Sequence, residues 1–280
     1  MAGNPRLRND IRFEALTGAE EPPATEAERH YGGALRLPSR PKPYVFANFV
    51  STLDGVASLG IHDGTDSSTI SGSNTADRFL MGMLRAAADV VLIGAGTLRA
   101  SVGHQWTPHA VAPDHDAVLS EYQRAMRRRQ GAPVLAVVTG SGQLPSHVAL
   151  TQPALEPIVL TSPDGVERVR AAFPHMRTLV VGTDRELKGR DIIDALHREL
   201  DAAVILTEGG PSLMGALLAT KALHELFLTI SPAIAGRDAS HPRLALVNDF
   251  VAPPRQLETA ALLSARRAGD HLFLRYRLRA

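Results

Sequence analysis

The sequence predicts an α/β fold, in which a mostly parallel central sheet is flanked by helices and followed by a C-terminal antiparallel hairpin. Short continuous apolar runs, typical of strands that are buried on both faces, recur along the chain. Stretches with helical spacing separate several of these runs, and strands that alternate with helices favour a parallel sheet. The last segment differs, because its apolar residues alternate with polar ones on either side of a Gly-Asp turn.

The expected elements begin at residue 44. The expected strands are 44–50, 89–93, 134–138, 158–160, 179–181, 204–206 and 226–230. The expected helices are 74–87, 163–172, 189–200 and 211–219, and the hairpin joins 257–266 to 272–279. The first helix carries an apolar stripe, with Phe79, Met83 and Ala87 spaced four residues apart. The polar segment 60–73 is rich in glycine and serine, so we expect a loop there.

Two regions of the chain differ in periodicity. Residues 1–41 contain several prolines and little periodic hydrophobicity, so we interpret them as an N-terminal arm with one short ordered piece near 11–16. Residues 42–280 show no composition shift or internal repeat, and we expect a single domain there.

Composition excludes several classes of function. With 30 basic and 29 acidic residues, the net charge of +1 provides no general attraction to nucleic acid or anionic membrane. The absence of cysteine excludes disulfides, thiolate metal ligands and cysteine nucleophiles, and the histidines show no metal-binding spacing. No apolar stretch has the length of a membrane span, and the polar first ten residues do not look like a signal peptide. We therefore expect a cytoplasmic protein that acts on a small molecule.

The segment 89–101 (DVVLIGAGTLRAS) is the first candidate site. Gly94 and Gly96 follow a buried strand, and a helix is expected to begin near Thr97. Glycines let an anionic ligand approach the backbone amides, and a helix N-terminus adds partial positive charge. A tight turn without a ligand explains the same residues. The segment also departs from the dinucleotide-binding fingerprint, because Arg99 stands where its third glycine would be.

The segment 204–218 (VILTEGGPSLMGALL) repeats this pattern. Gly209 and Gly210 leave amides available to a ligand, and Pro211 suits the first position of a helix. Glu208 is positioned to accept hydrogen bonds from an N–H-rich substrate or a ribose hydroxyl, or to cap the two glycine amides instead. Because ligands collect at the carboxyl ends of parallel strands, two such turns in one sheet favour a shared site.

The segment 48–56 (NFVSTLDGV) is a third candidate. Asn48 lies on an expected strand, while Asp54 is followed by glycine, as in many ordinary turns. The next loop supplies the hydroxyls of Ser67 and Thr69. Arg85, late on the following helix, is long enough to reach a phosphate, and a surface salt bridge is the alternative.

Three blocks together resemble a known family. STLDG, then ISG with LRAAADVVLIGAGT, then LTEGGPSLMGALL with LHELFLTISPAIAGR occur in this order. They are similar to the C-terminal reductase domain of the riboflavin-biosynthesis deaminase-reductase proteins, over residues 43–280. The resemblance implies a dihydrofolate-reductase-like fold and a homodimer. It also implies NADPH as cofactor and reduction of the ribosyl group of a 5-aminopyrimidine ribose phosphate to ribityl.

The resemblance also implies roles for individual residues. Ser162 matches a residue near the adenosine 2'-phosphate. The expected cofactor contacts are Thr69, Gly94, Gly96, Thr97, Ser162, Gly209, Gly210, Pro211, Ser212, Leu213 and Met214. The expected substrate contacts are Asn48, Ser67, Arg85 and Glu208. Asp54 and Glu208 are the carboxylates that we nominate as catalytic, without assigning a proton donor to either.

The departures from the family concern the substrate side. Without cysteine the chain lacks the ligands of the family's zinc deaminase, so we expect no deaminase activity. Asn48 stands where relatives carry a lysine, and 101–105 (SVGHQ) replaces an acidic stretch and an arginine that helps to hold the substrate phosphate. Loss of that charge-assisted contact removes about 1.5–3 kcal/mol. Two alternatives therefore stay open: an NADPH-dependent reductase of a pterin or folate such as dihydrofolate, with Glu208 facing the ring N–H groups, and a non-catalytic NADP(H)-binding sensor.

Overall fold

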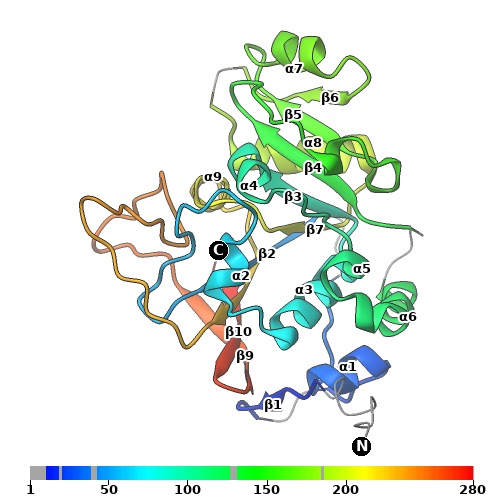
Figure 1. Ribbon diagram of the computed structural model, residues 1–280, viewed down its shortest axis with the longest axis vertical. Helices are drawn as coiled ribbons and strands as arrows, with labels where there is room; N and C mark the ends of the chain where they lie inside the picture. Colours follow the sequence, from blue (N-terminus) through cyan, green and yellow to red (C-terminus); the bar gives the residue numbers. More distant parts are fainter. Residues whose placement is uncertain (1–10, 19–20, 39–42, 127–130, 184–185, 280) are drawn as a thin grey trace, which may run out of the picture.

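The computed structural model describes residues 11–18, 21–38, 43–126, 131–183 and 186–279. In this part of the chain, ten strands form one sheet in the order β1-β9-β10-β8-β2-β7-β3-β4-β5-β6 (Figure 1). The strands are β1 (Glu14–Ala15), β2 (Tyr44–Ser51), β3 (Val90–Gly94), β4 (Val134–Thr139), β5 (Ile158–Thr161), β6 (Arg177–Val180), β7 (Val204–Thr207), β8 (Glu225–Ile230), β9 (Ala260–Ala268) and β10 (His271–Leu278).

Helices connect most of the parallel strands. They are α1 (Glu26–Tyr31), α2 (Asp66–Ile70), α3 (Thr75–Ala87), α4 (Ala95–Ala100), α5 (Pro108–Val111), α6 (Asp116–Met126), α7 (Val166–Ala172), α8 (Gly189–Leu200) and α9 (Pro211–Ala219). Short 3₁₀ turns are η2 (Pro113–His115), η3 (Val148–Leu150) and η4 (Pro153–Leu155).

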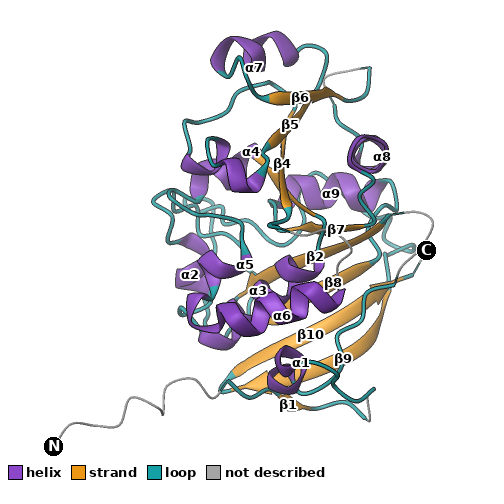
Figure 2. Ribbon diagram, turned by 90° about the vertical axis from the view of Figure 1, so that its right-hand side faces the viewer, coloured by secondary structure: helices purple, strands orange, loops and turns teal. Residues whose placement is uncertain are grey.

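The pairing of the strands confirms the predicted fold class. From β8 through β2, β7, β3, β4 and β5 to β6, all neighbours run parallel. The predicted hairpin is β9 and β10, which are antiparallel and extend the sheet beyond β8. Every expected strand is present, with ends that differ by up to three residues. The apolar runs made these strands predictable, because helices cover both faces of the parallel part (Figure 2).

Each face of the sheet has its own core. On one face α3 and α6 contribute Phe79, Met83 and Tyr122 to a cluster with strand residues such as Phe46. On the other face α8 and α9 pack Ile192, Leu196 and Leu217 against Val45, Ile205 and Leu92. Successive strand residues thus alternate between two apolar layers, which explains why these strands are apolar throughout their length.

Two segments differ from the prediction. The segment 60–73 contains the short helix α2, which begins at Asp66. The carboxylate of Asp66 accepts hydrogen bonds from Ser58 Oγ at 2.6 Å and from Leu59 N at 2.8 Å. The helices α5 and α6, for which we made no prediction, cover α3. In α6 only Leu119 and Tyr122 are buried, a spacing of three residues within a polar stretch that gives a weak sequence signal.

The described part of the N-terminal arm packs on the same core as the domain. The strand β1 pairs with β9, with Glu14 opposite Arg267. The Phe13 ring meets Phe273 edge-on at a centroid distance of 4.8 Å, and Tyr31 and Leu35 are also buried in this cluster. The division of the chain at residue 41 stays a prediction, and the short ordered piece expected near 11–16 includes β1.

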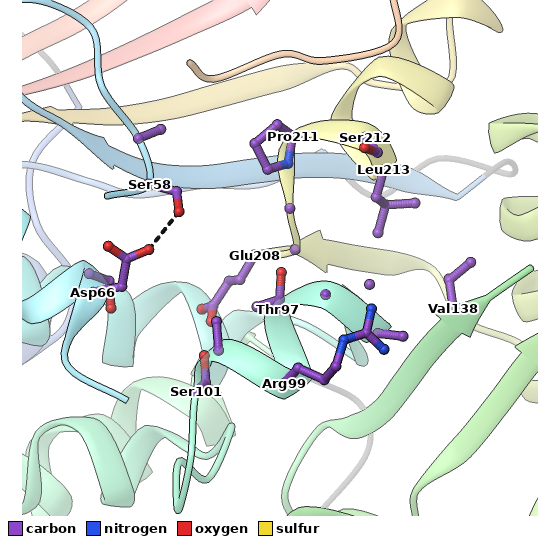
Figure 3. A pocket seen from close by; sticks show the side chains of 18 of the residues that line it. Ser58, Asp66, Thr97, Arg99, Ser101, Val138, Glu208, Pro211, Ser212 and Leu213 are labelled. Carbon is purple, nitrogen blue, oxygen red and sulfur yellow. Dashed lines mark hydrogen bonds between the residues drawn. The ribbon is translucent and has the colours of Figure 1, made fainter. Parts of the chain in front are cut away.

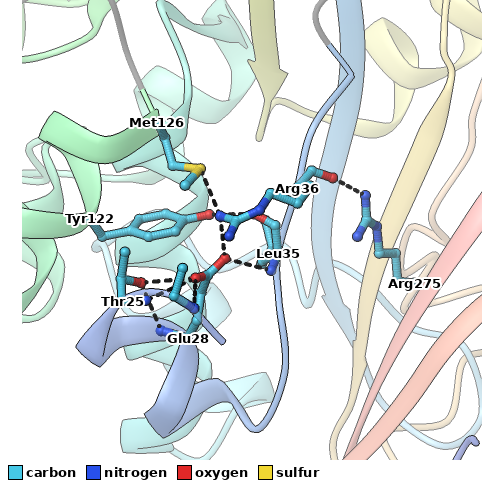
Figure 4. A network of polar contacts seen from close by, with 8 residues as sticks. Thr25, Glu28, Leu35, Arg36, Tyr122, Met126 and Arg275 are labelled. Carbon is cyan, nitrogen blue, oxygen red and sulfur yellow. Dashed lines mark hydrogen bonds and ion pairs between the residues drawn. The ribbon is translucent and has the colours of Figure 1, made fainter. Parts of the chain in front are cut away.

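A buried carboxylate, Glu28, holds the arm together (Figure 4). Its side chain is fully buried and accepts hydrogen bonds from Thr25 N at 3.1 Å and Leu35 N at 3.0 Å. Arg36 Nη1 lies 2.7 Å from the same carboxylate. Thr25 and Glu28 also form a capping box at the start of α1. The charge is therefore satisfied by backbone donors and one cation.

We expect Glu28→Gln to lower the free energy of unfolding by about 1.5–3 kcal/mol, because it weakens charge-assisted hydrogen bonds to a buried group. Urea denaturation of the whole chain measures this change. The matched control is Glu26→Gln, since Glu26 lies on the same helix but is exposed. Equal urea midpoints for Glu28→Gln and the wild type would contradict a stabilising role for the Glu28 network.

Candidate active site

The candidate site lies at the carboxyl ends of four neighbouring parallel strands. Because β2, β7, β3 and β4 are adjacent in the sheet, the segments that follow them meet at one edge. A cavity of about 660 Å³ is present there, within the usual range of cofactor pockets (Figure 3). The sequence-predicted residues that line it are Asn48, Ser67, Arg85, Gly94, Gly96, Thr97, Glu208, Gly209, Gly210, Pro211, Ser212 and Leu213.

The two glycine turns touch each other. Since β3 and β7 pair in parallel, with Leu92 opposite Thr207, the turns that follow them are neighbours. A Cβ atom at Gly209 would lie 2.3 Å from the Cα of Ile93, so no side chain fits at this position. Gly210 adopts a φ of +73°, which favours glycine, and a Cβ there would lie 3.1 Å from Thr97 Oγ1. The turns are thus closely packed on each other and expose backbone to the cavity.

The N-terminus of α9 offers unpaired amides. Gly210 is the N-cap and provides no side-chain hydrogen bond, while Pro211 has no N–H. The amides of Ser212 and Leu213 belong to the first turn, which has no partner within the helix. Both residues line the cavity. This end of the site therefore presents donors and the positive end of a helix dipole, an arrangement suited to an anion.

Arg99 adds a positive charge to this end. It lies on α4, lines the cavity and is exposed. Figure 3 shows its side chain extending from α4 toward Val138 on β4. Ser141, which follows β4, also lines the cavity. Arg99 forms no hydrogen bond or ion pair with the residues that the structure describes, so its charge is available to a ligand.

Arg85 and Glu208 form a buried ion pair in the other half of the cavity. Arg85 Nε donates to Glu208 Oε1 at 2.9 Å and Arg85 Nη2 donates to Glu208 Oε2 at 2.7 Å. Their side chains are 1% and 8% exposed. The alternative role considered for Arg85 in the sequence analysis was a surface salt bridge. Arg85 does form a salt bridge, but the pair is buried, and its partner Glu208 was not predicted.

The remaining N–H groups of Arg85 bind the loop 104–107. Arg85 Nη1 donates to the carbonyls of Gln105 and Thr107, each at 3.2 Å, and Nη2 lies 2.8 Å from His104 Nε2. Because an arginine only donates, His104 Nε2 accepts this hydrogen bond and carries no proton. Arg85 is thus fully committed within the protein, and its charge is already balanced by Glu208.

His104 is kept neutral by its surroundings. Burial and the neighbouring Arg85 charge lower the pKa of His104 to about 3. Its ring packs edge-on against Trp106 at 4.9 Å, and both side chains line the cavity. At neutral pH His104 therefore acts as a hydrogen-bond acceptor and a wall of the cavity.

We expect this histidine to make the fold sensitive to acid. Below a pH of about 6.5 the unfolded chain binds a proton at His104, whereas the folded chain does not until the pH approaches about 3. Stability is therefore lost as the pH falls through this window, by about 2 kcal/mol between pH 7 and pH 4.5. Urea denaturation of wild type and His104→Gln at both pH values measures the difference. The control is His241→Gln, which replaces an exposed histidine and is expected to lose as much stability as the wild type between pH 7 and pH 4.5. If His104→Gln also loses as much stability as the wild type, His104 is not the cause of the acid sensitivity.

Four predicted residues do not line the cavity: Asp54, Thr69, Ser162 and Met214. Thr69 is exposed on α2, and Met214 is buried in the core beneath α9. Ser162 is fully buried, and its hydroxyl donates to the Gly140 carbonyl at 2.7 Å. The polar group of Ser162 is therefore engaged in joining two strand ends.

Asp54 stabilises a loop. Its carboxylate accepts hydrogen bonds from Thr52 Oγ1 at 2.6 Å, Ala235 N at 3.1 Å and Gly236 N at 2.7 Å. These donors, with Thr52 contributing most, lower the pKa of Asp54 well below its ordinary value. A carboxylate held in this way is a poor proton donor at neutral pH, so we do not carry Asp54 into the proposed chemistry.

Asp77 is a pocket residue that the sequence analysis missed. It lies in the first turn of α3 and lines the cavity together with Met81 and Arg85. These three residues are spaced four apart, so they follow one stripe of the helix. A stripe that begins and ends with charged residues on a helix facing the sheet is a signal from which Asp77 could have been found.

Comparison with known proteins places the chain in a family. Residues 43–256 match the RibD C-terminal domain. No curated protein sequence matches the chain. In the described residues, no helix has the length and apolar character needed to cross a membrane, and no group of three or more histidines and carboxylates is placed to hold a metal ion.

Solved structures share the fold. A pyrimidine reductase-like protein from Corynebacterium diphtheriae is 22% identical with a TM-score of 0.66, covering 91% of this chain and 99% of that chain. The riboflavin biosynthesis reductase Rib7 of Saccharomyces cerevisiae is 16% identical with a TM-score of 0.57, covering 87% and 93%. The Thermotoga maritima deaminase/5-amino-6-(5-phosphoribosylamino)uracil reductase is 19% identical with a TM-score of 0.61, covering 85% and 57%.

The chain spans 57–59% of the length of the RibD structures that it matches. The family match nevertheless covers most of this chain, and it includes the glycine turns after β3 and β7 that line the cavity. The chain belongs to the RibD C-terminal domain family.

Proposed function

We propose that the chain is an NADPH-dependent reductase of the riboflavin-pathway type, which reduces the ribosyl group of a 5-aminopyrimidine ribose phosphate to ribityl. The observation that carries the proposal is the contact between the turns after β3 and β7 at one end of the cavity, where Gly209 leaves no room for a side chain. The homodimer and the cytoplasmic location that we expect from the sequence are part of the same proposal.

The residues at this end fit a dinucleotide. A diphosphate would meet the amides of Ser212 and Leu213 at the start of α9, beside the hydroxyl of Thr97. The backbone at Gly210 allows a close approach, because nothing projects from it into the cavity. NADPH, when bound, supplies the hydride, and the protein's part is to place the acceptor and exclude water.

Arg99 is better placed than Ser162 for the adenosine 2'-phosphate. The Ser162 hydroxyl is bonded to Gly140 and lies outside the cavity lining, whereas Arg99 lines the cavity without a partner among the described residues. We expect Arg99→Ala to weaken NADPH binding about 10- to 100-fold through loss of a charge-assisted contact, with little effect on NADH. Fluorescence titration with both cofactors measures this. Equal losses for NADPH and NADH would place the 2'-phosphate elsewhere.

The other half of the cavity supports a nitrogen-rich heterocycle as substrate. It contains the carboxyl groups of Asp77 and Glu208 and the side-chain amide of Asn48, all of which accept hydrogen bonds. Ser67 adds a hydroxyl. An aminopyrimidine presents several N–H donors to such a surface, so the composition of this half agrees with the proposed substrate.

One observation favours the second candidate, a pterin or folate such as dihydrofolate. A ribose phosphate needs a cation, and Arg85 is committed to Glu208 and to backbone carbonyls. Arg99 is the other arginine among the described lining residues and lies toward β4. A substrate without a phosphate group needs no cation in the half of the cavity that contains Asp77 and Glu208.

The deciding experiment is turnover by the purified chain. NADPH oxidation is followed by absorbance with the aminopyrimidine ribose phosphate and with dihydrofolate in parallel. Oxidation with the aminopyrimidine supports the proposal, and oxidation with dihydrofolate alone replaces it by the second candidate. Tight NADPH binding without oxidation of either would show a non-catalytic NADP(H)-binding protein and overturn both.

A further inference from the structure

Asp77 is a buried residue that lines the cavity, and its carboxyl group has no ion-pair partner among the described residues. The residue is 5% exposed and lies in the first turn of α3. Asn74 caps this helix, accepting a hydrogen bond from Asp77 N at 3.0 Å. The carboxyl of Asp77 is therefore not needed as the N-cap, and the backbone that carries it is fixed.

The groups around Asp77 favour its protonated form. Burial is the largest effect and raises the pKa of Asp77, and the Glu208 carboxylate at the end of β7 raises it further. The opposing influences are the Thr229 hydroxyl on β8, His271 on β10 and Arg78 on α3. The net result is a raised pKa, so the carboxyl retains its proton at a pH where an exposed aspartate is ionised.

The other carboxyl groups that line this half of the cavity are committed, and His62 lines it as an exposed side chain. Glu208 forms a bidentate pair with Arg85, and Asp66 accepts hydrogen bonds from Ser58 Oγ and Leu59 N. His104 Nε2 accepts a hydrogen bond from Arg85, so this nitrogen has no proton to give. Asp77 is the carboxyl group left in a position to exchange a proton with a bound molecule.

We propose that Asp77 is the general acid that protonates the imine nitrogen of the substrate. The inference rests on the proposed reductase function and holds for both candidate substrates, since each is reduced at a C=N bond. The carbon of that bond accepts the hydride supplied by NADPH, and the electron pair of the C=N bond moves to nitrogen. Nitrogen takes the proton from the Asp77 carboxyl as the O–H bond breaks, which leaves the carboxylate.

The position of Asp77 suits both stages of this step. Before transfer, burial and Glu208 keep the proton on the carboxyl. After transfer, the carboxylate lies in the first turn of α3, where the partial positive charge of the helix N-terminus stabilises it. Solvent water returns the proton when the product leaves.

The test compares Asp77→Asn with the wild type in single turnovers at saturating NADPH. We expect hydride transfer to slow by about 10²- to 10⁴-fold, as for loss of a general acid, with NADPH affinity unchanged within a factor of about three. Asp77→Glu, which restores a carboxyl group, is expected to recover part of the rate. The matched control is Asp116→Asn, because Asp116 lies in the first turn of α6 but is exposed and distant from the cavity lining.

The pH profile gives a readout that a structural role would not change. Because the protonated form is active, the wild-type rate is expected to fall as the pH rises through the raised pKa of Asp77. Asp77→Asn is expected to lose this limb. A rate in Asp77→Asn within threefold of the wild type, or an unchanged limb, overturns the inference.

Infrared difference spectroscopy tests the proton without turnover. At a pH above the ordinary pKa of an exposed aspartate, the wild type is expected to show the C=O stretch of a protonated carboxyl that is missing in Asp77→Asn, and the absence of this band overturns the inference. If the wild type turns over neither candidate substrate, the proposed function fails, and the band still decides whether Asp77 holds the required proton. If Asp77→Asn does not fold, the wild-type pH limb and the same band in Asp77→Glu decide.

Discussion

Replacing Gly210 with aspartate is expected to weaken NADPH binding by more than a hundredfold while the chain still folds. Gly210 is the N-cap of α9, and aspartate is among the preferred N-cap residues. Its carboxylate would occupy the amides that we propose for the diphosphate. Repulsion between unit charges about 5 Å apart is about 3 kcal/mol at an effective dielectric constant of about 20, which alone exceeds a hundredfold in affinity.

The backbone cost of this change is smaller than its effect on binding. The φ of +73° at Gly210 disfavours any side chain, and the new Cβ would lie 3.1 Å from Thr97 Oγ1. Strain of this kind costs about 1–2 kcal/mol, so we expect a lower urea midpoint and a folded protein. Gly210→Ala carries the same strain without the charge and is expected to bind NADPH more tightly than Gly210→Asp.

Fluorescence titration with NADPH measures the affinities. Gly269→Asp is the matched control, since Gly269 has a φ of +58° in the β9–β10 turn with open space around it. This control repeats the backbone strain and the added charge away from the cavity. If Gly210→Asp binds NADPH with the same affinity as Gly269→Asp, the cofactor does not bind at the N-terminus of α9.

Local patterns were sufficient to predict the strands of the sheet and the two glycine turns that line the cavity. The runs at 90–93 and 204–206 are apolar because both faces of the sheet are covered, and this marks them as strands of the parallel part. Glycine after each run, with Pro211 after the second, predicted a strand end and a helix start. Parallel pairing of β3 with β7 then places the two turns in contact, a pairing that the sequence analysis did not assign.

Side-chain partners across long sequence separations could not be predicted in the same way. Glu208 and Arg85 are 123 residues apart, and each alone looked like a ligand contact. Ser162 and Asp54 occupy the expected segments, but their polar atoms bond to Gly140 and to the 235–236 turn. Whether a hydroxyl or carboxylate faces a cavity or a neighbouring backbone depends on the path of a distant loop, which local spacing does not encode.

Two cavity residues that the sequence analysis missed, Asp77 and His104, differ in whether a local pattern marks them. Asp77 has a local signal, since its spacing from Arg85 places both on one stripe of α3. His104 has none, because its neutral state depends on the distant Arg85 and on the ring of Trp106. Helical spacing is a property of the sequence, whereas the electrostatic state of a side chain is a property of the assembled site.

Replacing Glu208 with alanine is expected to lower the free energy of unfolding by about 3–5 kcal/mol, because it leaves the Arg85 guanidinium buried without a counter-charge. Glu208→Gln keeps the shape and is expected to cost less. The matched control is Glu14→Ala, which removes the partner of Arg267 at the surface, where two guanidinium nitrogens donate to one carboxylate oxygen. Exposed pairs contribute less than about 1 kcal/mol. Urea denaturation measures all three, and equal losses for Glu208→Ala and Glu14→Ala would contradict the importance of burial.

A second use of Glu208→Gln is to identify the role of Glu208 in the proposed reaction. Glu208→Gln retains one hydrogen-bond acceptor and the volume of the side chain and introduces an N–H donor, but lacks the charge that opposes ionisation of Asp77. We therefore expect its pH–rate limb to shift to lower pH, since the pKa of Asp77 falls when the neighbouring negative charge is removed. A substrate contact by Glu208 would raise KM as well. An unshifted limb with raised KM would assign Glu208 to the substrate alone, whereas a shifted limb at constant KM would make it a positioning residue for Arg85 and Asp77.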